Sequence, residues 1–152
     1  MQRFAARAGS WSQSTPTVSG MDIAEIEHAV RRHCAARQDI AAVYLYGSRA
    51  RGTARAASDV DLAVLFHPGR EPAPGLASLA LPLEAELERA LGAPVQLAVL
   101  NAAPPDLTHR VLRDGRLLLE RDASARVAFE VRSRNEYFDL EPYLREYRRG
   151  AA

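Results

Sequence analysis

Two aspartates and a Gly-Ser pair stand at a fixed spacing near the middle of the chain. Gly47 and Ser48 end one apolar run, ten residues follow, and Asp59 and Asp61 begin the next apolar run. Side chains two apart on a strand share a face, so both carboxylates are expected on one side of a sheet. A paired anionic site suits Mg²⁺, which offsets the repulsion between the carboxylates. The alternative for an isolated Asp-x-Asp is two solvated residues at the start of a strand.

Gly47 and Ser48 occupy the point where the chain must turn sharply after the first of these runs. Glycine lacks a Cβ, so backbone N–H groups and the Ser48 hydroxyl can approach phosphate oxygens closely. A simple turn is the alternative for the dipeptide on its own. Combined with the two aspartates, the pair predicts a site where phosphates bridge to bound metal.

Regular hydrophobic patterns predict the elements that position this motif. Strands are expected over four apolar runs: residues 40–46, 59–66, 94–100 and, at the sheet edge, 116–120. Helices are expected over four segments: Asp22 to about Ala36, about Leu76 to Leu91, Pro104 to Gly115, and Asp122 to about Tyr147. Pro142 falls inside the last segment, so a helix break is expected near Asp139. The pattern indicates an α/β chain of the α+β type, with a mixed sheet of about four strands packed against helices.

Bulk composition fits one domain and excludes several mechanisms. The 152 residues carry a formal net charge of +1, so no global field favours a nucleic-acid polyanion. All basic residues are arginine, which excludes lysine nucleophiles and a Walker-type lysine.

The lone Cys34 suits a reducing cytoplasm, and the longest apolar run is too short to cross a bilayer. Residues 1–20 contain no acid and are expected to form a flexible leader to a domain over residues 21–148.

The segment YLYGSRARGTARAASDVDLAVLF resembles the signature of the DNA polymerase beta-like nucleotidyltransferase superfamily, in its minimal nucleotidyltransferase (MNT) branch. Downstream, PVQLAVLNAAPPDLTHRVLRDGRLLLERD and EYFDLEPYL are similar to antitoxins of HEPN/MNT toxin–antitoxin pairs. The resemblance covers about residues 22–147 and implies the nucleotidyltransferase fold.

In that family the antitoxin transfers AMP from ATP to a tyrosine of its partner, a HEPN-domain ribonuclease, and silences it. The resemblance implies that Gly47 and Ser48 hold the triphosphate and that Asp59 and Asp61 bind Mg²⁺, with two ions expected. Asp59, Asp61 and Ser48 are then the catalytic residues. The implied partners are a nucleoside triphosphate and a HEPN toxin in a hetero-oligomer, with no direct nucleic acid and no membrane.

Gln96 departs from the family pattern, because the third acid of the superfamily is expected at its position on the strand PVQLAVL. A neutral amide adds no charge for a second metal ion and accepts no proton as a carboxylate does. The nearest downstream acids are Asp106, Asp114 and Glu120, which are expected to be capping or surface residues. The departure leaves two hypotheses: an active AMP transferase, or an antitoxin that neutralises its toxin by binding alone.

Other residues near the motif and at the C-terminus allow more than one interpretation. Arg49 and Arg51 are expected to contact phosphate or a partner, or to be solvated loop residues. Phe129 and Phe138 are expected to pack the core, whereas the segment from Tyr143 to Arg149 is a candidate toxin-docking surface.

Three other classes of protein fit the sequence less well. A small-molecule nucleotidyltransferase usually needs an additional substrate domain, for which this chain has no room. A Rossmann protein requires a G-x-G-x-x-G after a strand, and none is present. The HEPN toxin itself would be all-helical, whereas three long apolar strands and a short edge strand are predicted here.

Overall fold

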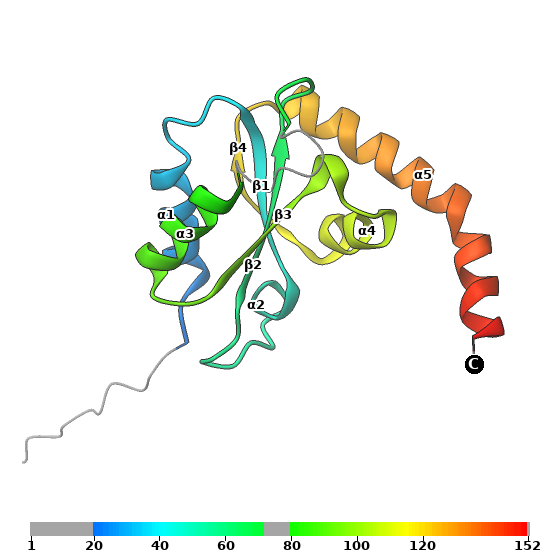
Figure 1. The fold of residues 1–152 in the computed structure, drawn as a ribbon, viewed down its shortest axis with the longest axis horizontal. Helices are drawn as coiled ribbons and strands as arrows, with labels where there is room; N and C mark the ends of the chain where they lie inside the picture. The colour runs from blue at the N-terminus through cyan, green and yellow to red at the C-terminus, as the bar shows by residue number, and fades with distance from the viewer. Residues whose placement is uncertain (1–19, 72–79, 152) are drawn as a thin grey trace, which may run out of the picture.

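The computed structural model describes residues 20–71 and 80–151, and a single sheet forms its centre (Figure 1). The strands are β1 (Ile40–Tyr46), β2 (Val60–Phe66), β3 (Val95–Val99) and β4 (Arg116–Glu120). Their order is β3-β2-β1-β4, with β1 antiparallel to both of its neighbours and β2 parallel to β3. The four-stranded mixed sheet confirms the predicted fold class, and β4 lies at an edge as expected.

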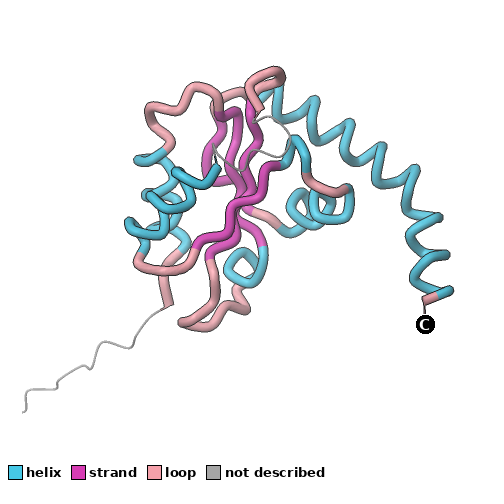
Figure 2. The backbone as a smooth tube through the Cα atoms, viewed as in Figure 1, coloured by secondary structure: helices cyan, strands magenta, loops and turns pink. Residues whose placement is uncertain are grey.

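Helices cover both faces of the sheet (Figures 1 and 2). One face carries α1 (Ile23–His33) and α3 (Ala80–Leu91), and the other carries α4 (Pro105–Asp114) and α5 (Ala123–Gly150). A five-residue helix, α2 (Gly47–Arg51), follows β1, and a 3₁₀ turn, η2 (Leu100–Ala102), follows β3. The predicted leader lies outside the described residues apart from Gly20, as do residues 76–79 of the predicted second helix. Among the residues described, no helix has the length and apolar character needed to span a bilayer.

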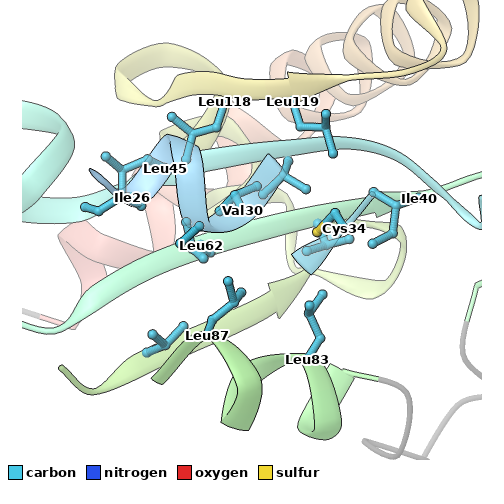
Figure 3. Close-up of a cluster of buried hydrophobic side chains, with 14 of the residues drawn as sticks. Ile26, Val30, Cys34, Ile40, Leu45, Leu62, Leu83, Leu87, Leu118 and Leu119 are labelled. Carbon is cyan, nitrogen blue, oxygen red and sulfur yellow. The ribbon is translucent and has the colours of Figure 1, made fainter. Parts of the chain in front are cut away.

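The face under α1 and α3 is packed with aliphatic side chains, several of which are labelled in Figure 3. Ile26 and Val30 of α1 and Leu62 of β2 are completely inaccessible to solvent. Cys34 lies in the same cluster, where burial raises the pKa of its thiol to about 11. Its inaccessibility agrees with the absence of any disulfide partner in the sequence.

Helix ends follow their capping residues. Asp22 and Glu25 form a capping box at the start of α1, but the helix ends at His33, three residues before the predicted end. Pro105 opens α4 and Gly115 caps its end. A Cβ added at Gly115 would lie 2.3 Å from the Val111 carbonyl oxygen and 3.1 Å from that of Leu45. Glycine therefore allows the end of α4 to lie directly against the end of β1.

The free edge of β3 is covered by side chains from α3. The backbone N–H of Val95 donates to Glu88 at 3.1 Å, and that of Leu97 donates to Glu84 at 2.9 Å. Both carboxylates come from successive turns of the helix that precedes the strand. Amides that a further strand would use are therefore already satisfied.

The last helix, α5, is continuous, so the predicted break near Asp139 is wrong. Proline removes one intrahelical hydrogen bond and favours a bend, and α5 curves as it leaves the sheet (Figure 1).

The two phenylalanines of α5 differ in burial. Phe129 packs in the core as predicted, but Phe138 is 60% exposed, so that part of the prediction is wrong. The outer half of α5 projects past the sheet, which explains why helical spacing alone misassigned Phe138.

Candidate functional site

The two aspartates lie at the start of β2, on the face of the sheet that α4 and α5 cover. Asp59 directly precedes the strand, and Asp61 is its second residue. The neighbours Val60 and Leu62 belong to the opposite cluster, under α1 and α3, so alternation places Asp61 on the α4 side with Ala63. Gln96, whose Cα pairs with that of Asp61, is hydrogen-bonded to Asp59. Both carboxylates therefore share one face, as the two-residue spacing predicts.

Gly47 brings the first half of the motif against the second. Its φ of +71° lies in the left-handed region, and its Cα faces the Asp61 side chain. A Cβ at this position would lie 2.2 Å from Oδ2 of Asp61, well inside contact distance. The position thus requires glycine for two reasons: its backbone conformation and the close approach of the Asp61 carboxylate.

Charge and burial act together on Asp61. Burial raises the pKa of this carboxyl above its usual value, and the negative charge of Asp59 raises the pKa further. Arg51 and Arg49 partly offset these effects and lower the pKa. An acid pair with this repulsion is the electrostatic setting in which a bound cation is stabilising.

Arg49 is buried and holds the loop before β2, a role absent from the sequence predictions. Its side chain is 6% exposed, and its guanidinium donates to the backbone carbonyls of Ser58 and Asp59. The guanidinium therefore fixes the backbone that presents the first carboxylate. The alternative that Arg49 is a solvated loop residue is wrong, because α2 turns the side chain inward.

Gln96 occupies the position beside the acid pair that the sequence analysis assigned to it. Its Cα pairs with that of Asp61 across the parallel strands, and its Nε2 donates to Oδ2 of Asp59 at 3.0 Å. Within the described ranges, no group of three or more His, Cys, Asp and Glu side chains could hold a metal ion. The acid pair therefore has an amide as its third neighbour.

The three downstream acids are engaged elsewhere by arginines, as expected of surface residues. Asp106 pairs with Arg148, Asp114 with Arg113, and Glu120 with Arg126. Their ion pairs leave the two aspartates of the motif as the acids of this site.

Tyr46 also borders the site, and Arg110 of α4 is close enough to Tyr46 to affect its pKa. Neither residue was predicted from the sequence. Tyr46 is the cross-strand Cα partner of Asp61. Burial raises the pKa of its hydroxyl, the charge of Asp61 raises it further, and Arg110 lowers it. The strand spacing could have identified Tyr46, which precedes Gly47 directly, but Arg110 comes from α4 and required the tertiary fold.

The chain from the middle of α1 to the start of α5 matches a known family model. Residues 28–124 match the family described as polymerase beta, nucleotidyltransferase. The chain belongs to this family. No curated protein matches the sequence of this nucleotidyltransferase family member significantly.

Solved structures share the fold of this nucleotidyltransferase. A toxin–antitoxin structure with AMP-PNP aligns with a TM-score of 0.70 at 24% identity, over 82% of this chain and 97% of that one. A tri-AMPylated Shewanella oneidensis HEPN toxin in complex with its MNT antitoxin aligns with a TM-score of 0.64 at 23% identity, over 83% and 95%. A protein assigned as a minimal nucleotidyltransferase is 37% identical over 64% of this chain and 97% of its own, with a TM-score of 0.51.

Proposed function

We propose that this chain is an antitoxin that transfers AMP from ATP to a tyrosine of a cognate HEPN ribonuclease and thereby neutralises it. Gly47 and Ser48 bind the nucleotide, and Asp59 and Asp61 bind Mg²⁺. The observation that carries the proposal is the contact between Gly47 and Asp61, which unites the two halves of the motif at one point. We place the activity in the cytoplasm, where the lone thiol of Cys34 stays reduced.

Two kinds of similarity support the proposal. Membership of the polymerase beta nucleotidyltransferase family supports nucleotidyl transfer as the reaction class. Similar folds occur in a toxin–antitoxin structure with AMP-PNP and in an MNT antitoxin bound to a tri-AMPylated HEPN toxin. The AMP-PNP of the first structure supports ATP as the substrate of this chain, and the AMPylated toxin of the second supports a HEPN protein as the acceptor of AMP.

The donor set fits one Mg²⁺ ion better than two. Asp59 and Asp61 offer carboxylate oxygens on one face. Burial and the negative charge of Asp59 both raise the pKa of Asp61, and a cation would relieve the repulsion between the two carboxylates. Bound Mg²⁺ would neutralise phosphate charge. A second ion would need a further carboxylate, and Gln96 supplies an amide in its place.

The chain's own groups position the reactants. The backbone at Gly47 and the Ser48 hydroxyl orient the triphosphate, while the two carboxylates would hold the Mg²⁺ that neutralises the phosphate charge. The tyrosyl oxygen loses its proton to solvent and attacks the α-phosphorus. The bond between the α-phosphorus and the oxygen that bridges it to the β-phosphorus breaks, and pyrophosphate leaves. Positioning and charge neutralisation account for most of the acceleration in such a transfer.

The test is incubation of the chain with Mg²⁺, ATP and the HEPN protein encoded beside it, followed by mass analysis of the partner. We expect AMP on a partner tyrosine and loss of its ribonuclease activity. Asp59→Asn and Asp61→Asn should each abolish transfer. Glu86→Gln is the control, since that carboxylate lies on α3, on the opposite face of the sheet, and its loss should leave transfer unchanged. An unmodified partner under these conditions contradicts transfer.

A second candidate function is neutralisation by binding alone, and the hydrogen bond from Gln96 to Asp59 favours it. The amide ties up one oxygen of a proposed metal ligand and cannot take the proton of an attacking hydroxyl. On this candidate, the Asp59→Asn and Asp61→Asn variants still neutralise the toxin.

Gln96→Asp separates the two candidates. If the wild-type chain is a slow transferase, the added carboxylate should raise the rate of AMP transfer. If the chain acts by binding alone, both forms neutralise the toxin to the same degree without AMP on the partner. Gln96→Glu is the control, because it adds the same negative charge but places the carboxylate one methylene further from the backbone.

A further inference from the structure

A small polar pocket lies between the turn η2 and the helices α4 and α5, which pack against each other on one face of the sheet (Figure 1). Its volume is about 110 Å³, and its lining includes Asn101 of η2, Thr108 of α4 and Ser133 of α5. The Asn101 side chain is fixed by hydrogen bonds to the backbone N–H and carbonyl of Phe66, at 2.9 and 3.1 Å. Such a space has roughly the volume of three or four water molecules, enough for one small polyatomic ion.

The pocket and the acid pair lie at opposite ends of the sheet. The turn η2 directly follows the carboxyl end of β3, whereas Asp59 and Asp61 lie at the amino end of β2. These two strands run parallel, so their amino ends are together and η2 is at the far end. None of the residues that line the pocket belongs to the proposed nucleotide site.

Two buried hydroxyl groups open into the pocket from different helices. Thr108 is 4% exposed and Ser133 is 9% exposed. Among the described residues neither hydroxyl has a hydrogen-bond partner, and no side-chain oxygen there is both inaccessible and unpaired. The two oxygens are therefore accessible, and the pocket that both residues line is the space they reach. Because buried hydroxyls are normally hydrogen-bonded, this pair indicates a polar ligand.

A guanidinium group borders the same pocket. Arg132 lies over the ring of Phe129, with its guanidinium carbon 5.7 Å from the ring centroid, and both residues line the pocket. Within residues 20–71 and 80–151, this guanidinium forms no ion pair, even with Glu136 one turn further along α5. Arg132 is therefore available to an external anion.

Helix α4 begins at this pocket, to which Pro105 contributes. Pro104 at the N-cap provides no side-chain hydrogen bond, so no capping group offsets the positive end of the helix dipole. The acid of the first turn, Asp106, pairs with Arg148 at 3.3 Å. Together with Arg132 and the two hydroxyls, this helix end favours a negatively charged ligand.

Glu136 also lines the pocket and restricts which anion fits. A carboxylate repels an oxyanion without a proton, but it accepts a hydrogen bond from one that keeps an OH group. Hydrogen phosphate keeps one OH at neutral pH even as a dianion. Sulfate has none, and a phosphate monoester has largely lost its last proton at this pH.

We propose that this pocket binds hydrogen phosphate. Thr108, Ser133 and Arg132 donate hydrogen bonds to its oxygens, and Glu136 accepts one from its OH group. The bound ion would join α4 to α5 at the point where the two helices meet the end of the sheet. The inference depends neither on nucleotide binding nor on AMP transfer.

Titration of the full chain with inorganic phosphate at neutral pH, followed by NMR, tests this assignment. The backbone amide signals of Thr108 and Ser133 should shift and reach saturation. Sulfate and phenyl phosphate, each at the same ionic strength, should bind at least about tenfold more weakly, because neither offers the OH group that Glu136 accepts. Phenyl phosphate also tests whether an ester rather than free phosphate is the ligand.

Variants of the pocket test each contact. Ser133→Ala and Thr108→Val should each weaken phosphate binding by about tenfold, the loss of one hydrogen bond to a charged ligand. Ser124→Ala is the control, since it removes an exposed hydroxyl from the first turn of α5. Glu136→Gln, at an exposed position, replaces the carboxylate by an amide that can also donate, so sulfate should then bind as tightly as phosphate.

Three outcomes would overturn the assignment. The first is a wild-type chain whose Thr108 and Ser133 signals show no saturable shift with phosphate. The second is equal binding of phosphate and sulfate by the wild type, which would remove the role of Glu136. The third is binding of phenyl phosphate as tight as that of inorganic phosphate. Thermal unfolding of each variant without phosphate, expected to match the wild type, excludes misfolding as the cause of a loss.

Discussion

The two faces of the sheet carry different kinds of side chain. Under α1 and α3, the strands contribute aliphatic residues such as Val60, Leu62 and Val64, all fully buried. Under α4 and α5, the same strands contribute Tyr44, Tyr46 and Asp61, with Gln96 on the neighbouring strand. One strand, β2, thus supplies an apolar core from its even-numbered residues and an acid from an odd-numbered one.

This difference separates stability from chemistry within one sheet. The aliphatic face buries side chains that require no hydrogen-bond partners, so it can fix the strands firmly. The opposite face holds a like-charged pair, in which burial and the charge of Asp59 raise the pKa of Asp61. A rigid core on one side lets the other side keep an arrangement that is unfavourable without a ligand.

The largest effect on chemistry is expected for Gly47→Ala. Its Cβ would displace the Asp61 carboxylate and impose a positive φ on alanine, so AMP transfer should fall by about 100-fold or more. Gly52→Ala is the matched control, because Gly52 has a φ of +74° with no atom near its added Cβ. Comparing AMP transfer by the two variants separates the effect of the clash with Asp61 from the effect of the positive φ. Equal losses of transfer would mean that backbone strain, and not the clash, is the cause.

The largest effect on folding is expected for Leu62→Ala on the aliphatic face. Leu62 is completely buried beside the helices, so its truncation should lower the free energy of unfolding by about 2–5 kcal/mol. Leu117→Ala, at a position that is 42% exposed on β4, should cost far less. Urea unfolding of both variants checks the contrast, and similar costs would contradict the assignment of the core to this face.

A smaller effect, on both stability and chemistry, is expected for Arg49→Ala. Loss of its bonds to the Ser58 and Asp59 carbonyls should lower the free energy of unfolding by about 1–3 kcal/mol and reduce transfer by loosening Asp59. Arg55→Ala removes an exposed arginine from the same loop as a control. Transfer at the wild-type rate in Arg49→Ala would show that Asp59 is positioned without this clamp.

The smallest effect on folding is expected from deletion of residues 142–152, the outer end of α5. Tyr143 and Tyr147 are 71% and 76% exposed, so the melting temperature should change little. Binding to a cognate toxin should weaken by about tenfold or more, because tyrosine and arginine dominate many interfaces. Deletion of residues 151–152 alone is the control, and unchanged binding in the longer deletion would refute the docking surface.

Much of the fold follows from local sequence patterns. The runs 40–46 and 116–120 are strands over the predicted residues, and Asp22 and Gly115 mark helix ends as expected. Gln96 lies beside the acid pair, as the family resemblance implies. The strands follow from hydrophobic runs and the helix ends from capping residues, so each can be predicted from neighbouring residues alone.

Features that depend on tertiary contacts were not predicted. Helix α2 is only five residues long and is bounded by glycines, so its sequence is typical of a turn. Burial of Arg49 follows from that helix, and the contact of α4 with Tyr46 follows from the packing of Leu107 and Val111 on this face of the sheet. The uninterrupted α5 also escaped prediction, because a proline on an exposed helix is tolerated with a bend.

The carboxylates of Glu84 and Glu88 that cover β3 limit how this molecule can assemble. An open strand edge invites pairing with a neighbouring chain, which is a common route to aggregation. Here an incoming strand would have to displace two acids and meet their negative charge in place of free amides. Extension of the sheet through β3 is therefore disfavoured, so this edge is protected against the strand pairing that propagates into fibres.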